Sequence, residues 1–202
     1  KGIIPVDFAG YPQNLEEMRE IADEYGLWIL EDACHAPGGY FMDERGEKQY
    51  CGNGQYANVS VFSFHPVKHI ATGEGGMVTT NDEELYKKLC LYRTHGITKD
   101  PTSLHENHGG WYYEMQQLGF NYRMTDLGIS QLKRANDGLI RRQEIAHRYY
   151  EAFQAVEGIV TPKVFGNVYH AFHLYIIQVE DRFGLYNHLR KNNVYAQVHY
   201  VP

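Results

Sequence analysis

The sequence predicts an α/β fold with a parallel sheet, and two observations lead to this class. An apolar, strand-like run at residues 2–6 is followed by a helical pattern at 14–25 and by a second apolar run at 27–30. Hydrophobic residues make up 43% of the 202-residue chain, which is enough for a real core. A β–α–β order joins parallel strands, so the strand ends are expected to share one edge where ligands of open α/β sheets bind.

The first helix has local signals at both ends. Asn14 stands where an N-cap is expected, with the acidic Glu17 three residues later, and Gly26 follows the last helical residue. Leu15, Met18, Ile21 and Ala22 recur at the spacing of one helix face, and this face is expected to pack on the sheet.

The middle of the chain is expected to alternate loops, strands and one further helix. The expected elements are a polar, Gly-rich loop at 37–56, strands at 59–64 and 76–80, a helix from Asn81 or Asp82 to Arg93, and an irregular segment at 94–118. A loop as long as the last of these is usually functional or mobile.

The last third begins with a long helical stretch at about 125–156, and its character changes near Gly158. The expected elements beyond that point are a first strand, a loop, a strand at 172–179, a helix at 182–191 and a strand at 194–200. We therefore expect residues 1–124 to form part of a large α/β domain, 125–157 a connecting helix, and 158–202 the beginning of a smaller α/β domain.

Composition argues against several classes of protein. The formal net charge is −6 and the basic residues are dispersed, so nucleic acid and anionic membranes are not expected partners. Cys34, Cys51 and Cys90 form no paired motif, which fits reduced thiols in the cytoplasm. No apolar run approaches membrane-spanning length. The chain starts on Lys1 with a strand-like run close behind, which indicates an internal piece of a longer protein.

Lys68 and Asp32 are the residues most indicative of chemistry. Asp32 ends the second predicted strand, and Lys68 lies in the loop between the strands at 59–64 and 76–80. An amine that can form an imine and a carboxylate that can hold a protonated ring nitrogen are the groups that a pyridoxal phosphate site requires. Each also has an ordinary interpretation, since Asp32 can cap a turn and Lys68 can be a solvated loop residue.

Two further residues fit the same site. Ser63 lies five residues before Lys68, where its hydroxyl can donate to a phosphate, and His35 follows Asp32 on the same turn, where it can bond a phenolic oxygen. Their ordinary interpretations are a strand serine and a turn histidine. Asp32, Cys34 and His35 match no zinc spacing, so no metal is expected. The stretch at 73–76 precedes a strand rather than a helix, which argues against a phosphate loop.

Six ordered segments of the chain resemble the DegT/DnrJ/EryC1/StrS family of sugar-nucleotide aminotransferases, which have the aspartate-aminotransferase-like architecture of fold type I. They are EDACHA at 31–36, SVFSFHPVK at 60–68, TGEGG at 72–76, RTHG at 93–96, GFNYRMTD at 119–126 and QVHY at 197–200. Residues 111–117 and 196–200 look most like the branch that aminates a UDP-linked 4-keto-6-deoxy-N-acetylhexosamine, with glutamate as donor, in pseudaminic acid synthesis. The resemblance implies an incomplete α/β/α large domain with the start of the small domain.

The resemblance also implies roles for individual residues. Lys68 would carry pyridoxal 5'-phosphate and move the proton, Asp32 would bind the ring nitrogen, His35 the phenolic oxygen and Ser63 the phosphate. Asn121 would reach the cofactor and substrate of a neighbouring subunit, because members of the family build their sites across a homodimer interface. Gln197, Val198, His199 and Tyr200 would lie along the sugar nucleotide.

Two other functions remain open from the sequence. The family's amino-terminal part, with a phosphate-binding turn and a ring-stacking aromatic residue, has no counterpart in this chain. The chain can therefore be a catalytically incomplete fragment that only binds pyridoxal phosphate or a sugar nucleotide. A sugar dehydratase on the same scaffold is the third possibility; the resemblance implies histidine in place of Lys68 in that branch.

Overall fold

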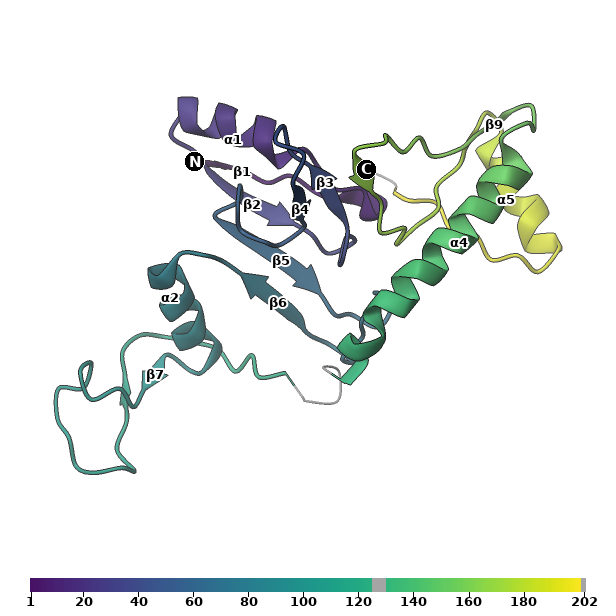
Figure 1. The fold of residues 1–202 in the computed structure, drawn as a ribbon. Helices are drawn as coiled ribbons and strands as arrows, with labels where there is room; N and C mark the ends of the chain where they lie inside the picture. Colours follow the sequence, from purple (N-terminus) through teal and green to yellow (C-terminus); the bar gives the residue numbers. More distant parts are fainter. Residues whose placement is uncertain (125–129, 201–202) are drawn as a thin grey trace.

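The computed structural model describes residues 1–124 and 130–200. Its central sheet has the strand order β1 (Gly2–Ile3), β2 (Trp28–Asp32), β5 (Val59–Ser63) and β6 (Gly76–Thr79) (Figure 1). The first three strands are parallel, as the β–α–β order predicts, whereas β6 runs antiparallel to β5. The reason for the reversal is the connection, since a loop without a crossover helix returns the chain beside β5.

Helix α1 (Leu15–Glu24) lies on one face of this sheet (Figure 1). Leu15 and Ala22 pack with Ile29 of β2 in the main core, and Ala22 and Ile29 are 0% exposed. Ile21, which the periodicity assigns to the same face, is 51% exposed, so that part of the prediction is wrong.

The ends of α1 lie close to where the sequence predicts them. Gly26 follows the helix with φ of +61°, a backbone conformation that glycine adopts without strain. At the other end the side chain of Asn14 donates to Glu17 (2.7 Å) and accepts no backbone N–H of the helix. The capping residue is therefore the expected one, but its hydrogen bond differs from that of a capping box.

A second, three-stranded antiparallel sheet has the order β10 (Val168–Tyr169), β3 (Tyr40–Met42) and β4 (Lys48–Tyr50). The prediction of a loop over 37–56 is therefore wrong in its middle. Asp43 makes the hairpin turn, because its Oδ1 accepts the N–H groups of Arg45 (3.0 Å) and Glu47 (2.8 Å). The polar turn residues dominate the composition and conceal two short strands.

Helix α2 (Glu83–Arg93) starts as predicted, since Asp82 accepts the N–H of Leu85 at 3.0 Å. The following segment contains only the short antiparallel pair β7 (Ile97–Thr98) and β8 (Glu114–Met115). Figure 1 shows it extending away from the central sheet. The irregular character expected for 94–118 is otherwise confirmed.

A 3-10 helix, η2 (Ser130–Arg134), leads into α4 (Ala135–Phe153). This helix accounts for most of the stretch expected at 125–156, of which residues 125–129 lie outside the described part. Beyond it come β9 (Ile159–Val160), β11 (Gln178–Val179) and α5 (Arg182–Lys191). In the described chain no helix is long and apolar enough to cross a membrane.

Two strand predictions near the carboxyl end are wrong. Residues 172–177 are not a strand, because the neighbouring N–H groups of Ala171 and Leu174 bond to the carbonyls of Gly10 and Ala9. Residues 194–200 have the alternation of a strand but pair with none of the described strands. The boundary at 158 stays a prediction; β10 lies beyond it and yet pairs with β3.

Candidate active site

Asp32 lies at the carboxyl end of β2, with β1 on one side and β5 on the other. Its backbone N–H donates to Pro5 (2.8 Å), its carbonyl accepts from Asp7 (3.0 Å), and Val61 is its partner in the β2–β5 register. The half-buried carboxylate accepts the N–H of Cys34 through Oδ1 at 3.1 Å. Strand pairing on both sides therefore fixes this carboxylate at the edge where open α/β sheets bind ligands.

Ser63 and Lys68 reach the same edge from β5. Ser63 ends the strand, and its Oγ accepts the N–H of His65 (3.3 Å), which begins a turn closed by Lys68 N–H to His65 carbonyl (2.9 Å). The loop folds back on itself, because Thr72 donates to Phe64 at 2.9 Å. Lys68 is thus held in a short, half-buried loop beside the strand end.

Asp32 and Lys68 act electrostatically on the same two side chains. Burial, then Asp32, raises the pKa of the Cys34 thiol to about 12, while Lys68 acts in the opposite direction. Burial, then Lys68, lowers the pKa of His35, and Asp32 opposes this. The carboxylate and the amine therefore both lie within electrostatic range of Cys34 and His35, and within the described chain they form no ion pair with each other.

His35 is buried in this turn with a defined tautomer. Its Nδ1 accepts the N–H of Ala9 at 3.3 Å, so the proton of the neutral ring sits on Nε2. The ring lies 4.4 Å from that of His173 and 6.1 Å from that of Phe8, measured between centroids. A neutral imidazole with its proton on Nε2 can donate a hydrogen bond to an oxygen acceptor.

The carboxyl-terminal residues reach this cluster only in part. The ring of Tyr200 packs edge-on against Phe8 at 5.7 Å, and the charge of His199 contributes to lowering the pKa of His35. Gln197 and Val198 are exposed, and the described contacts include none between their side chains and Asp32, His35 or Lys68.

Asn121 belongs to another part of the molecule. Its backbone pairs with Thr94 just after α2, and the residue is exposed. Among the residues that the structure describes, it has no hydrogen bond with the cluster of Asp32, His35, Ser63 and Lys68. Its expected role, across a subunit interface, stays a prediction.

Sequence reasoning missed the segment at 170–173, which packs behind the cluster. The Nε2 of His69 donates to the carbonyl of Ala171 at 3.1 Å, and Arg142 donates to the carbonyl of Phe172 at 3.0 Å. Burial lowers the pKa of His69 to about 4 and that of His173 to about 3, so both rings are neutral at pH 7. The sequence signal for this segment was the pair of histidines at 170 and 173, and the residues that His173 approaches in the structure, His35 and His69, are far away in the chain.

A buried carboxyl pair lies on the opposite face of β2. Asp7 and Glu31 are 0% and 1% exposed, and Glu31 accepts from Ser60 Oγ (2.5 Å) and Gly52 N–H (2.9 Å). Burial, followed by the charge of Glu31, raises the pKa of Asp7 to about 8. Ligand atoms of Asp7, Glu31 and Cys51 lie within 4.8 Å of one another. Protonation of Asp7 removes one negative charge from this buried group, and the protonated carboxyl can donate a hydrogen bond to Glu31.

The sequence profile of the DegT/DnrJ/EryC1/StrS aminotransferase family matches residues 1–202. The chain belongs to this family. It is 41% identical over its whole length to the uncharacterized protein MJ1066 of Methanocaldococcus jannaschii, of which it covers 53%. It is 36% identical to the UDP-4-amino-4,6-dideoxy-N-acetyl-beta-L-altrosamine transaminase of Campylobacter jejuni, with 98% of this chain and 51% of the transaminase covered.

The fold of this chain is also similar to that of solved aminotransferase structures. The structure is similar to that of the sugar aminotransferase Spr1654 of Streptococcus pneumoniae in its PMP form, described as putative. The TM-score is 0.85 at 30% identity, and the comparison covers 100% of this chain and 56% of the other. The aminotransferase-like α/β architecture expected from the sequence is therefore confirmed. The chain spans about half the length of the curated relatives that it matches.

Proposed function

We propose that this chain carries the reactive lysine and the ring-binding carboxylate of a pyridoxal-phosphate-dependent aminotransferase that acts on a nucleotide-linked 4-keto-6-deoxy sugar. The observation that carries the proposal is the position of Asp32 at the end of β2 and of Lys68 in the loop after the neighbouring parallel strand β5, both within electrostatic range of Cys34 and His35. Family membership supports the reaction class.

The side chains at this edge of the sheet carry the chemical groups that pyridoxal 5'-phosphate requires. Lys68 offers a primary amine, Asp32 a carboxylate with one oxygen engaged by Cys34 N–H, and His35 an Nε2–H directed by its bond to Ala9. Ser63 adds a hydroxyl for the phosphate. When bound, this cofactor supplies an electron-accepting ring that stabilises negative charge at the carbon losing its proton.

The residues of the chain have distinct tasks in this proposal. Lys68 anchors the cofactor and then holds and moves the proton of the reacting carbon as general acid and base. Asp32, fixed by strand pairing, keeps the ring nitrogen protonated. His35 stays neutral because burial and Lys68 lower its pKa, so it donates through Nε2–H at neutral pH.

The substrates and the assembly are also proposals. The name of the Campylobacter jejuni relative supports a UDP-linked amino sugar as product, and glutamate is the proposed amino donor. His199 and Tyr200, beside His35 and Phe8, are proposed to contact the sugar nucleotide together with Gln197 and Val198. Asn121 is proposed to act across a homodimer interface. The three free cysteines support the cytoplasm as the compartment.

Titration with pyridoxal phosphate tests the proposal. The full-length protein should develop visible absorbance that saturates at about one cofactor per chain and disappears in Lys68→Ala. Lys99→Ala, which removes an exposed lysine of the 94–118 segment, is the matched control and should keep the absorbance. A wild-type protein that stays colourless with excess cofactor would refute the proposal.

A cofactor-binding module without catalysis is the second candidate, because the chain spans about half the length of its relatives. It predicts the same absorbance with the isolated chain, but no spectral change when glutamate is added. The dehydratase alternative is disfavoured by Lys68, and it predicts loss of water from the keto sugar without consumption of glutamate.

A further inference from the structure

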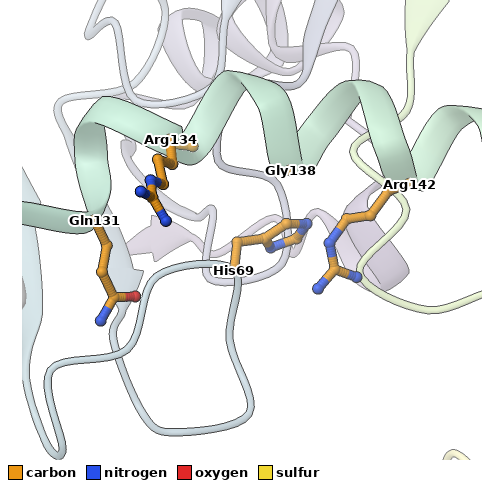
Figure 2. A pocket seen from close by; sticks show the side chains of 6 residues that line it. His69, Gln131, Arg134, Gly138 and Arg142 are labelled. Carbon is orange, nitrogen blue, oxygen red and sulfur yellow. The ribbon is translucent and has the colours of Figure 1, made fainter.

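The loop that carries Lys68 is hydrogen-bonded to the side chain of Gln131 in η2. Gln131, in η2, accepts the backbone N–H of Ala71 through Oε1 at 3.2 Å and donates through Nε2 to the carbonyl of Ala71 at 2.7 Å. One planar amide thus satisfies both backbone polar groups of a residue only three positions after Lys68. Figure 2 shows the side chain of Gln131 reaching from the helix toward this loop.

The neighbouring residues of the loop are held on other sides. His69 donates to the carbonyl of Ala171 at 3.1 Å, Ile70 is 5% exposed, and Thr72 donates to Phe64 at 2.9 Å. Ala71 is therefore the position at which the loop is hydrogen-bonded to η2, through the side chain of Gln131.

Packing does not fill the space behind the loop. A cavity of about 200 Å³ separates part of the loop from α4, and it is lined by His69, Gln131, Arg134, Ala135, Gly138 and Arg142 (Figure 2). Apolar contact across a cavity cannot fix the distance between two elements. The two hydrogen bonds of Gln131 can, because an amide presents an acceptor and a donor at a fixed separation.

We propose that Gln131 is a positioning residue for Lys68: it ties the loop of the reactive lysine to η2, the 3-10 helix that leads into α4, and fixes where the amine can react. This inference rests on the function proposed above. Gln131 acts through the backbone of Ala71, and the hydrogen bonds of the described residues include none between Gln131 and Lys68. Glutamate at this position would keep the acceptor for Ala71 N–H and lose the donor, and methionine would lose both while keeping a similar length.

Two measurements on the full-length protein test this role. The first is hydrogen exchange at the Ala71 amide in the absence of cofactor. Exchange should be roughly tenfold faster in Gln131→Met, as expected for the loss of one to two net hydrogen bonds from a local opening. Gln131→Glu keeps the acceptor for Ala71 N–H but directs a second carboxylate oxygen at the Ala71 carbonyl, so its exchange should lie between those of the wild type and Gln131→Met. Gln154→Met, the same substitution at an exposed glutamine just after α4, should leave exchange unchanged.

The second measurement is the pH midpoint of the visible absorbance that Lys68 gives with pyridoxal phosphate. The midpoint should shift in Gln131→Met and stay at the wild-type value in Gln154→Met. A substitution that only lowers the stability of the protein would not shift this midpoint. Wild-type exchange and an unshifted midpoint in Gln131→Met would overturn the inference. If exchange is faster in Gln131→Met but the wild-type protein never becomes coloured with pyridoxal phosphate, the proposed function is refuted, and with it any role of Gln131 in the reaction.

Discussion

The buried carboxyl of Asp7 should make the stability of the protein depend on pH, and Asp7→Asn should remove that dependence. Asp7 is 0% exposed, and burial beside Glu31 raises its pKa from 3.8 to about 8. Because the folded-state pKa lies above the unfolded one, the protonated carboxyl contributes stability that is fully present below pH 3.8. That contribution is lost as the pH rises through about 8.

The size of the effect follows from the linkage between protonation and folding. One pKa unit corresponds to about 1.4 kcal/mol, so three pH units between pH 5 and 8 amount to at most about 4 kcal/mol of unfolding free energy. Asparagine has the shape of the protonated acid. Its oxygen can accept the N–H of Gln13, as Asp7 Oδ1 does at 2.9 Å, and its amide can donate to Glu31 at every pH.

Urea unfolding at pH 5 and pH 8 measures this difference. The wild-type protein should lose up to about 4 kcal/mol more than Asp7→Asn between the two pH values, and the variant should be the more stable protein at pH 8. Asp137→Asn, at an exposed position in α4, is the control and should follow the wild type. Equal pH slopes for wild type and Asp7→Asn would show that Asp7 is not protonated in the folded protein.

Three other substitutions test the fold and the edge of the site. Ile29→Ala removes a fully buried side chain from the main core and should cost about 2–5 kcal/mol in urea unfolding; a cost below about 1 kcal/mol would contradict the assigned core. Asp82→Ala removes the cap of α2 and should cost about 1 kcal/mol, seen as faster amide exchange at Leu85, with unchanged exchange speaking against the cap. Gly10→Ala places a Cβ 2.9 Å from the carbonyl of His35 at a φ of +99°, so it should weaken pyridoxal phosphate binding as well as lower the thermal midpoint, and wild-type values of both would contradict the packing beside His35.

The parts of the fold that follow from local signals were predictable from the sequence. Asp82 and Gly26 mark helix ends because a short polar side chain or a missing Cβ acts within one turn of the chain. The hairpin of β3 and β4 was missed, since its two strands are three residues long and its turn is fixed by Asp43. The strand expected at 194–200 has the right alternation, but alternation alone cannot supply a neighbouring strand.

The candidate site likewise contains residues that were predictable from the sequence and residues that were not. The common location of Asp32, Ser63 and Lys68 was predictable, because the end of β2 and the loop after β5 meet at one sheet edge, a rule of topology that can be read from element order. His173 and Gln131 were missed, because their contacts with His35 and Ala71 join residues far apart in the chain. Nothing in the local sequence of either residue distinguishes it from an ordinary histidine or glutamine.

Borohydride reduction of the full-length protein with pyridoxal phosphate, followed by peptide mapping, tests the central claim most directly. We expect one stable pyridoxyl group per chain, located on Lys68, and a lower yield of this labelled lysine in Asp32→Asn. Labelling spread over exposed lysines such as Lys99, with Lys68 unmodified, would show that the amine and the carboxylate at this sheet edge do not hold one cofactor between them.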